Sequence, residues 1–217
     1  MVKYGMVIDL DRCVGCAACA VICKVENSVT SSTPEDYKKR RMMEWNRVVT
    51  TFNGKFPNAR ASIMPLICNH CEDPMCVKVC PVGASYKRED GLVLIRDDRC
   101  IGCKYCMEAC PYGQRFFNFY EQETKDYENP DVPHRIAGIV EKCTFCSHRL
   151  DKAIAQGQKI GSPDGVVPAC VQSCPANTRT FGDLDDPDSE VSKLLQNRRN
   201  YQLRAELGRN TQVYYLD

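Results

Sequence analysis

Sixteen cysteines are the residues of this chain best able to do chemistry, and they fall into four groups of four with none left over. In chain order the groups are Cys13, Cys16, Cys19 and Cys23; Cys68, Cys71, Cys76 and Cys80; Cys100, Cys103, Cys106 and Cys110; and Cys143, Cys146, Cys170 and Cys174. The thiolate form of cysteine is a soft ligand for metal ions and metal clusters. Sixteen cysteines at short, repeated spacings therefore point first to bound metal.

The first and third groups share the spacing C-x2-C-x2-C-x3-C, and Pro111 follows the third group. This run holds 4Fe-4S clusters in bacterial ferredoxins, where three cysteines bind one cluster and the fourth binds the other. The second group widens one gap to four residues and is followed by Pro81, whereas the fourth group separates its halves by 23 residues and is followed by Pro175. Lys24 stands where a proline would be expected after the first group. All four groups are interpreted as iron-sulfur ligands.

The first and third groups also belong to an internal repeat, because residues 11–16 (DRCVGC) return as residues 98–103 (DRCIGC). Alternating apolar residues at 4–10 precede the first copy, and an apolar run at 92–95 after an Asp-Gly turn signal precedes the second. The last two cysteines of each group are four residues apart, which is about one helical turn. Each copy is therefore predicted to form a strand, a loop with the cysteines, and a short helix.

Three other uses of cysteine compete with this interpretation. An even number of cysteines permits disulfides, but tightly spaced C-x2-C repeats are poorly placed to form eight bridges. A thiol redox site needs only one C-x-x-C motif, and sixteen cysteines exceed that need. Zinc is the stronger alternative for the fourth group alone, because two separated cysteine pairs can make a tetrahedral four-thiolate site.

The remaining sequence excludes several classes of protein. A formal net charge of +1 gives no basic excess for binding nucleic acid. No run of about 18 apolar residues is present, so no membrane-spanning helix is expected, and residues 1–13 show no signal peptide. Motifs for nucleotide binding or for a nucleophilic serine are also missing, so this chain is not expected to catalyse a reaction on its own.

Charged residues beside the cysteines are candidates for tuning a bound cluster. Each thiolate-ligated 4Fe-4S cluster carries about two negative charges, so a nearby cation raises its reduction potential. Such cations are more often solvated than functional, and the alternative is that at least one of those beside the cysteines tunes a cluster. These cations are Arg12, Arg99, Lys104, Lys142 and Arg149. His70, inside the second group, is either an ordinary loop residue or a donor to a sulfur, and the basic run 38–41 is either a solvated face or a partner contact.

Taken together, the four groups resemble the iron-sulfur electron-transfer (beta) subunit of the molybdopterin oxidoreductases of the dimethyl sulfoxide reductase family. Polysulfide, thiosulfate, tetrathionate and arsenate reductase subunits are the most similar in pattern. The residues that carry the resemblance are Cys13-Val14-Gly15-Cys16, Cys68-Asn69-His70-Cys71, Cys76-Val77-Lys78-Val79-Cys80-Pro81, Cys110-Pro111-Tyr112-Gly113, Lys142-Cys143-Thr144-Phe145-Cys146, Pro168-Ala169-Cys170, Cys174-Pro175 and Thr180-Phe181-Gly182-Asp183-Leu184. The resemblance covers essentially the whole chain.

The resemblance implies four 4Fe-4S clusters, each held by three cysteines of one group and the last cysteine of another. The implied ligand sets are set 1, Cys13, Cys16, Cys19 and Cys174; set 2, Cys68, Cys71, Cys76 and Cys110; set 3, Cys80, Cys100, Cys103 and Cys106; and set 4, Cys23, Cys143, Cys146 and Cys170. It also implies that set 1 faces the catalytic subunit and that set 4 faces a membrane quinone subunit.

The implied fold class is α+β, with two ferredoxin-like 4Fe-4S modules in a pseudo-symmetric arrangement and loop-rich insertions. The expected parts are an outer module with the first and fourth groups, residues 1–59 and 121–185; an inner module with the second and third groups, residues 60–120; and a C-terminal tail for subunit contacts, residues 186–217. We expect the tail to begin with a helix near 189–197 and to end with a strand at 212–216. Residues 26–62 hold no ligands and are also assigned to subunit contacts.

The implied function is electron transfer without catalysis. The chain would relay single electrons between a membrane quinone or quinol subunit and a molybdopterin catalytic subunit, in anaerobic respiration of sulfur or arsenic compounds. The alternative is a polyferredoxin-type subunit of a hydrogenase or formate dehydrogenase complex. Expected partners are the catalytic subunit and a membrane anchor, with no nucleic acid and no membrane span. The expected place is a membrane-associated complex, on the periplasmic side after export with the catalytic subunit, with the cytoplasmic side as the alternative.

Overall fold

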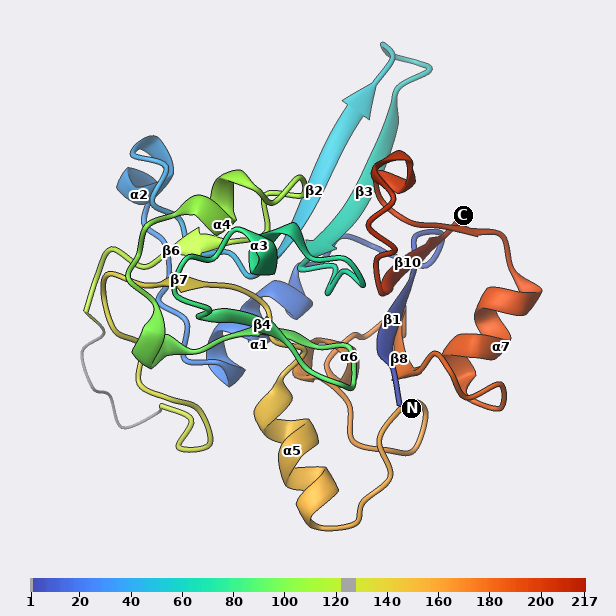
Figure 1. The fold of residues 1–217 in the computed structure, drawn as a ribbon. Helices are drawn as coiled ribbons and strands as arrows, with labels where there is room; N and C mark the ends of the chain where they lie inside the picture. The colour runs from blue at the N-terminus through green and yellow to red at the C-terminus, as the bar shows by residue number, and fades with distance from the viewer. Residues whose placement is uncertain (1, 122–127) are drawn as a thin grey trace.

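The computed structural model describes residues 2–121 and 128–217 as an α+β protein (Figure 1). The helices are α1 Ala18–Glu26, α2 Pro34–Lys38, α3 Met75–Lys78, α4 Tyr105–Glu108, α5 Ser147–Ala155, α6 Ala169–Gln172 and α7 Glu190–Asn197, with 3-10 turns η1 Asp97–Arg99 and η2 Ala205–Leu207. The strands are β1 Tyr4–Asp9, β2 Asn46–Asn53, β3 Arg60–Ile67, β4 Ser85–Lys87, β5 Val93–Ile95, β6 Phe116–Phe117, β7 Val140–Glu141, β8 Arg179–Asp183, β9 Asn200–Tyr201 and β10 Val213–Leu216. Met1 and residues 122–127, which fall in the segments expected for the outer module, lie outside the described residues.

The helices are short. The longest, α1 and α5, have nine residues each. Over the two described ranges, none of the helices is long and apolar enough to cross a bilayer. Helix α7 begins where Ser189 caps it, because the Ser189 hydroxyl accepts a hydrogen bond from the backbone N–H of Ser192 at 3.2 Å. This helix confirms the one expected at the start of the tail.

The largest sheet joins the two ends of the chain. Its strand order is β8-β1-β10-β9, with β1 parallel to β10 and antiparallel to β8. Strand β1 is buried on both faces, since Met6 and Ile8 belong to the main core and Val7 packs with Val191 and Leu216 on the other face. The predicted C-terminal strand is confirmed as β10, and it completes this sheet rather than lying free for a partner.

Each smaller connection links the end of one cysteine group to the start of another. Strand β4 follows the second group and pairs with β5, which precedes the third. Strand β6 follows the third group and pairs with β7 before the fourth, while β8 follows the fourth group and pairs with β1 before the first. Helices α1 and α6 pack together, as do α3 and α4. The strand, loop and helix predicted around the first and third groups are confirmed by β1 with α1 and by β5 with α4.

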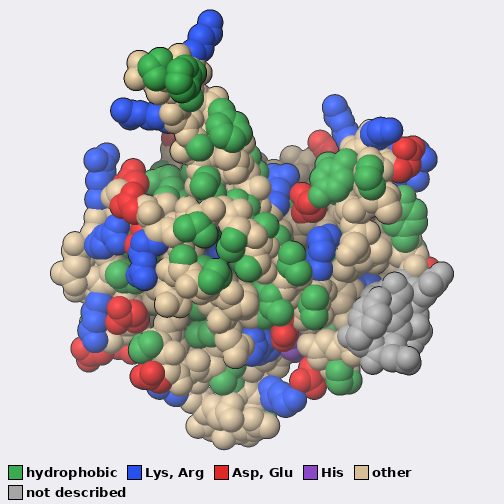
Figure 2. Space-filling view, turned by 180° about the vertical axis from the view of Figure 1, so that it is seen from behind, with side chains coloured by type: hydrophobic (Ala, Val, Ile, Leu, Met, Phe, Trp, Pro, Cys, Tyr) green, Lys and Arg blue, Asp and Glu red, His purple; other side chains and the backbone are tan. Residues whose placement is uncertain are grey.

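Strands β2 and β3 form an arm that projects from the rest of the molecule (Figure 1). They pair in register from Asn46 opposite Ile67 to Asn53 opposite Arg60, and exposure increases toward the tip. Phe52 is 78% exposed there. Figure 2 shows hydrophobic and basic side chains gathered at the end of this arm. A two-stranded hairpin is only marginally stable alone, so an arm with an exposed aromatic tip suits a contact surface.

Candidate metal centres

Two cavities of similar size are each lined by four cysteines from distant parts of the chain. The first encloses about 330 Å³ of space between atoms, and its four cysteines are the members of set 1. The second encloses about 310 Å³, and its four cysteines are the members of set 3. In each case three cysteines come from one group, and the fourth is the last cysteine of another. The structure therefore gathers the thiols of these two sets around an open space.

Within set 2 and within set 4, the four thiols are also close enough to influence one another. Burial, followed in effect by the other three thiols of set 2, raises the pKa of Cys71 to about 12. Burial likewise raises the pKa of Cys23 well above its usual value, with the other three thiols of set 4 next in effect. Neighbouring thiolates repel one another in a low-dielectric site, which favours their protonated form. A bound metal ion, or the cationic iron-sulfur core of a cluster, would favour the deprotonated form instead.

The backbone takes the same unusual conformation in all four cysteine loops. The residue just before the second cysteine of each group has positive φ: Gly15 at 70°, His70 at 41°, Gly102 at 66° and Phe145 at 54°. Turns of this kind direct backbone N–H groups into a concave space that favours anions. Backbone N–H groups donate to thiol sulfurs at 3.4 to 3.5 Å; these pairs are Ser85 with Cys80, Val140 with Cys100, Phe145 with Cys143 and Thr178 with Cys174.

The donor set fits a polynuclear cluster better than a single ion. Within residues 2–121 and 128–217, no three or more cysteine, histidine or carboxylate side chains are grouped to hold one metal ion. A structural zinc site needs four ligands around one centre at about 2.3 Å for sulfur, so zinc in the fourth group stays an alternative that metal analysis decides. All sixteen cysteines are free, so the disulfide alternative is not realised. Thiols around a cavity, with N–H donors directed at the sulfurs, match what an anionic iron-sulfur cluster requires.

His70 connects the second group to the fourth. Its Nε2–H donates to the carbonyl oxygen of Cys143 at 3.1 Å, and its Nδ1 accepts from the N–H of Val93 at 3.1 Å. Both ring nitrogens are thus used by backbone groups, and the alternative that His70 donates to a sulfur is wrong. Its ring stacks on that of Phe145 with centroids 3.9 Å apart. Burial lowers the pKa of His70 well below its usual value, so the ring is neutral.

Side-chain contacts and electrostatic effects link set 1 to set 4 and set 4 to set 2. Arg179 donates to sulfurs of both Cys19 in set 1 and Cys170 in set 4. Burial, then the thiol of Cys170, then that of Cys68 in set 2 raise the pKa of Cys143 in set 4. All four thiols of set 4 are buried, whereas Cys16 of set 1 and Cys103 of set 3 are exposed. The expectation that set 4 faces a membrane partner stays a prediction, although the exposure of Cys103 favours set 3 for such a contact.

The cations predicted to tune a cluster differ in their surroundings. Arg12 and Arg99 are exposed, and the ammonium of Lys104 lies over the ring of Phe117. Arg149 hydrogen-bonds Gln172 and lies 3.6 Å from Glu26. Lys142 is buried, but it donates to the backbone carbonyls of Val93 and Cys143.

Sequence reasoning missed two buried arginines, Arg115 and Arg179, which lie directly against the thiols. A signal for them was available in the chain. The pattern C-P-x-x-x-R occurs at Cys110 to Arg115 and again at Cys174 to Arg179. Each arginine thus stands five residues after the last cysteine of its group.

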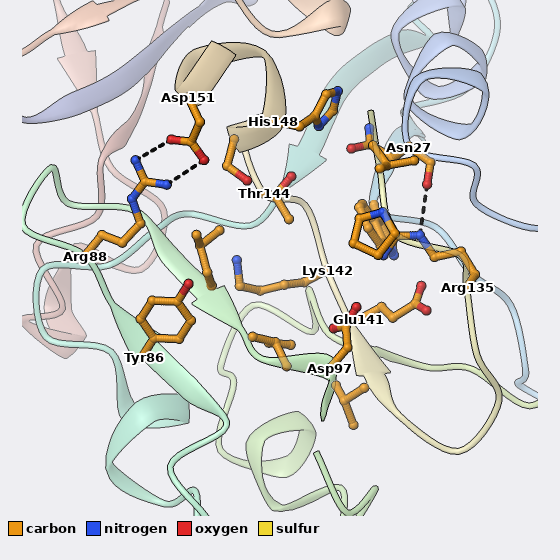
Figure 3. A pocket seen from close by; sticks show the side chains of 17 residues that line it. Asn27, Tyr86, Arg88, Asp97, Arg135, Glu141, Lys142, Thr144, His148 and Asp151 are labelled. Atoms are coloured by element: carbon orange, nitrogen blue, oxygen red, sulfur yellow. Dashed lines mark hydrogen bonds and ion pairs between the residues drawn. The ribbon is translucent and has the colours of Figure 1, made fainter. Parts of the chain in front are cut away.

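A polar pocket with about 750 Å³ of space between atoms lies where segments between Asn27 and Asp151 meet (Figure 3). Arg88 forms ion pairs with Asp90 and Asp151 across it, and the side chain of Arg135 donates to the carbonyl oxygen of Asn27 at 3.0 Å. Burial raises the pKa of Glu141, which also lines the pocket, to about 7. These contacts tie α5 to the turn after β4 and the segment before β7 to the end of α1, so the pocket joins segments of the fold.

Cysteines gathered in fours, in loops between short strands and helices, define an iron-sulfur protein. The 4Fe-4S dicluster domain family matches residues 59–184. A protein of Halobacterium salinarum, named as the iron-sulfur subunit of a dimethyl sulfoxide reductase, is 43% identical over 100% of this chain and 80% of its own length. The arsenate respiratory reductase iron-sulfur subunit of Shewanella sp. ANA-3 is 37% identical over 99% and 96%. The iron-sulfur cluster-binding subunit of the menaquinone reductase of Nitratidesulfovibrio vulgaris is 40% identical over 99% and 89%.

The chain therefore belongs to the family of iron-sulfur subunits of the molybdopterin oxidoreductases, as the sequence pattern predicted. Its relatives also include the corresponding subunits of a sulfite dehydrogenase, a tetrathionate reductase and a selenate reductase. The names of these relatives span several substrates, whereas the similarity to them extends over almost the full length of this chain.

Proposed function

We propose that this chain is a non-catalytic electron-transfer subunit that carries four 4Fe-4S clusters. It relays single electrons between a quinone-linked membrane partner and a molybdopterin catalytic partner. The observation that carries the proposal is the gathering of sixteen cysteines into two four-thiol cavities and two further four-thiol sites. In this proposal the residues of sets 1 to 4 are the ligands. When bound, each cluster accepts and releases one electron, at a potential set by burial, charge and hydrogen bonds.

The residues of this chain hold the clusters in line and exclude water from the middle of the path. The proposed order is 1, 4, 2, 3, and it is supported by the burial of set 4 and the exposure of Cys16 and Cys103. Sets 1 and 4 belong to the proposed outer module, where α1 packs on α6, and sets 2 and 3 to the inner module, where α3 packs on α4. The exposed ends of the path, at Cys16 and Cys103, are the places for the two redox partners.

The projecting arm supports the assignment of the catalytic partner to the set 1 end. Val48 and Pro65, near the base of the arm, line the cavity of set 1, and Ile63 packs against the loop of Gly15. A partner that grips the exposed tip, including Phe52, would lie beside set 1. We assign this contact to the molybdopterin partner and assign the membrane anchor to the set 3 end.

Electrons and protons balance if the membrane partner oxidises a quinol. Each quinol releases two electrons and two protons at the membrane partner. This chain passes the two electrons on one at a time, and the catalytic partner uses both electrons to reduce a sulfur or arsenic compound. The names of relatives in arsenate and tetrathionate reduction and in menaquinone reduction support these two classes of partner. We place the complex at the membrane, on the periplasmic side after export with the catalytic partner.

Metal analysis of anaerobically purified protein tests the proposal directly. We expect about 16 iron and about 16 acid-labile sulfide per chain, because four thiolate-bound 4Fe-4S clusters require them. Electron paramagnetic resonance of the reduced protein should then show interacting spins. About 12 iron with one zinc would instead mean that the fourth group holds zinc.

A variant of one ligand in the proposed inner module separates electron relay from catalysis. Cys106→Ala should lose or convert the cluster of set 3 and interrupt electron transfer from quinol. The assembled complex should still reduce substrate from an artificial electron donor that delivers electrons directly to the catalytic partner. Loss of that artificial-donor activity would contradict a purely relaying role for this chain.

A further inference from the structure

Arg179 lies between two sets of thiols. Its side chain is 4% exposed. Its Nη2 donates to Cys19 Sγ at 3.3 Å and to Asn46 Oδ1 at 3.1 Å. Its Nη1 donates to Cys170 Sγ at 3.6 Å and approaches Met6 Sδ at 3.8 Å. One guanidinium therefore contacts a thiol of set 1 and a thiol of set 4 at the same time.

Arg115 takes the corresponding place between sets 2 and 3. It is also 4% exposed, and its Nη1 donates to Ser85 Oγ at 2.8 Å. Its buried Nη2 has no nitrogen or oxygen partner among residues 2–121 and 128–217. Although burial opposes its charge, the thiols of Cys76 and Cys106 raise the pKa of Arg115. A buried cationic nitrogen without a protein partner, beside thiols of two sets, suits a contact with an anionic cluster.

The two arginines correspond in their place in the sequence and in the thiols whose charges act on them. Each follows the last cysteine of its group by five residues in a C-P-x-x-x-R pattern. Each also neighbours the third cysteine of both groups in its pair, Cys19 and Cys170 for Arg179, and Cys76 and Cys106 for Arg115. Two independent packing accidents would not repeat both the spacing and the pair of partners.

We propose that Arg115 and Arg179 are positioning residues that set the potentials of the clusters in pairs, Arg179 for sets 1 and 4 and Arg115 for sets 2 and 3. This inference rests on the proposed function. Reduction adds negative charge to a cluster, and a fixed cation in a low-dielectric site stabilises the reduced form more than the oxidised form. Arginine suits the place because its charge does not titrate and its planar fork reaches two acceptors.

Each arginine faces thiols of both sets in its pair, so its positive charge attracts an added electron on either cluster. Replacement by a neutral residue should therefore lower both potentials of one pair. The step between the pairs, from set 4 to set 2, is bridged by the neutral His70 and Phe145 stack and should not respond.

The test is a redox titration followed by electron paramagnetic resonance on the assembled complex with the variants Arg179→Gln and Arg115→Gln. We expect Arg179→Gln to lower the potentials of sets 1 and 4 and to leave sets 2 and 3 unchanged, and Arg115→Gln to do the reverse. The lysine variants Arg179→Lys and Arg115→Lys keep the charge but lose the fork, and should recover part of each shift. They also serve if a glutamine variant does not fold.

Arg12→Gln and Arg99→Gln are matched controls. These residues precede the first cysteines of the two repeated groups, but they are exposed, so solvent and salt screen their charge. We expect little change from either. The inference is overturned if glutamine variants that retain their iron keep wild-type potentials, if both pairs shift together, or if the controls shift them equally. Wild-type protein without about 16 iron would instead overturn the proposed function itself.

Discussion

Helix α1 packs on α6 in one half of the molecule and α3 on α4 in the other, yet the two halves bring their cysteines together over very different lengths of chain. The inner half spans Cys68 to Cys110 and is linked by the short hairpin of β4 and β5. The outer half spans Cys13 to Cys174 and needs β1, β8 and β10 in one sheet. The same kind of thiol site is therefore built locally in one half and by the global fold in the other.

The arginine in each half is anchored in the same way as its cysteines. Arg179 begins β8 in the large sheet and has oxygen and sulfur partners on several segments. Arg115 stands just before β6 and is held by Ser85, which begins β4. The outer half gains rigidity from long-range contacts, whereas the inner half depends on a few local ones. We therefore expect corresponding substitutions to have different effects in the two halves.

The largest difference between the two halves should come from Cys174 and Cys80. Each of them completes a four-thiol site whose other three cysteines belong to a different group. Cys174→Ser should break the link between the two ends of the chain, so both outer clusters should be lost and iron should fall to about 8 per chain. Cys80→Ser, the inner counterpart, should cost set 3 alone and leave about 12 iron. Iron analysis of the two purified variants measures this, and equal losses would remove the distinction between the halves.

A second pair of variants compares the repeated loops. Both Gly15 and Gly102 have positive φ, which costs an alanine about 1–2 kcal/mol. A Cβ on Gly102 would lie 2.1 Å from the carbonyl oxygen of Gly138, whereas on Gly15 it would meet the movable Ile63 side chain at 3.2 Å. Overpacking adds about 1–3 kcal/mol, so Gly102→Ala should destabilise the protein by about 2–5 kcal/mol and Gly15→Ala by about 1–2 kcal/mol.

Urea unfolding of the two loaded alanine variants provides the measurement. A larger loss for Gly15→Ala would show that the outer loop, not the inner one, is the more tightly packed. The inner loop of Gly102 would then be the less constrained of the two repeated loops.

Removal of the anchor of the inner arginine should have a smaller effect. Ser85→Ala takes away the oxygen that accepts from Arg115 and leaves a buried charged donor unsatisfied, at a cost of about 1–3 kcal/mol. The outer potentials should not change. Denaturant unfolding combined with a redox titration checks both statements, and a shift in sets 1 and 4 would mean that the halves are coupled through this residue.

The smallest effect is expected at Tyr215, which ties the large sheet to the base of the arm. Its buried hydroxyl donates to the carbonyl oxygen of Pro65 at 2.9 Å. Tyr215→Phe should cost about 0.5–1.5 kcal/mol of unfolding free energy and leave the iron content unchanged. Lys152→Gln, which removes an exposed ion pair with Asp131, is the control and should cost less than about 1 kcal/mol. A cost for Tyr215→Phe no larger than that of the control would contradict this role.

The sequence predicted the features that are local in the chain. The cysteine groups, the strands before Cys13 and Cys100 and the helices after them follow from spacing and periodicity, and the structure contains them. The tail illustrates the limit of that reasoning. Its last strand was predicted from its strand-like residues, but its place between β1 and β9 depends on the tertiary fold, which the local sequence does not reveal.

The missed or corrected residues share a different cause, since their partners are far away in the chain. Arg179 contacts Cys19, and His70 contacts Cys143, so only the tertiary fold reveals what each side chain faces. Arg12 and Arg99 were among the cations considered for tuning a cluster because they are close to the cysteines in sequence, but they are exposed. Proximity in sequence is enough to propose ligands, but it does not reveal which charged groups the fold brings against them.

The parallel pairing of β1 with β10 has a consequence for the order in which the protein is made. At about 5–20 residues per second, synthesis takes roughly 10–40 s to proceed from β1 to the end of β10, but only about 2–8 s from Cys68 to Cys110. The first cysteines to leave the ribosome are thus the last to be enclosed. For that interval they are open to oxidation and to mispairing, and loading of the inner half can begin before the outer half can exist.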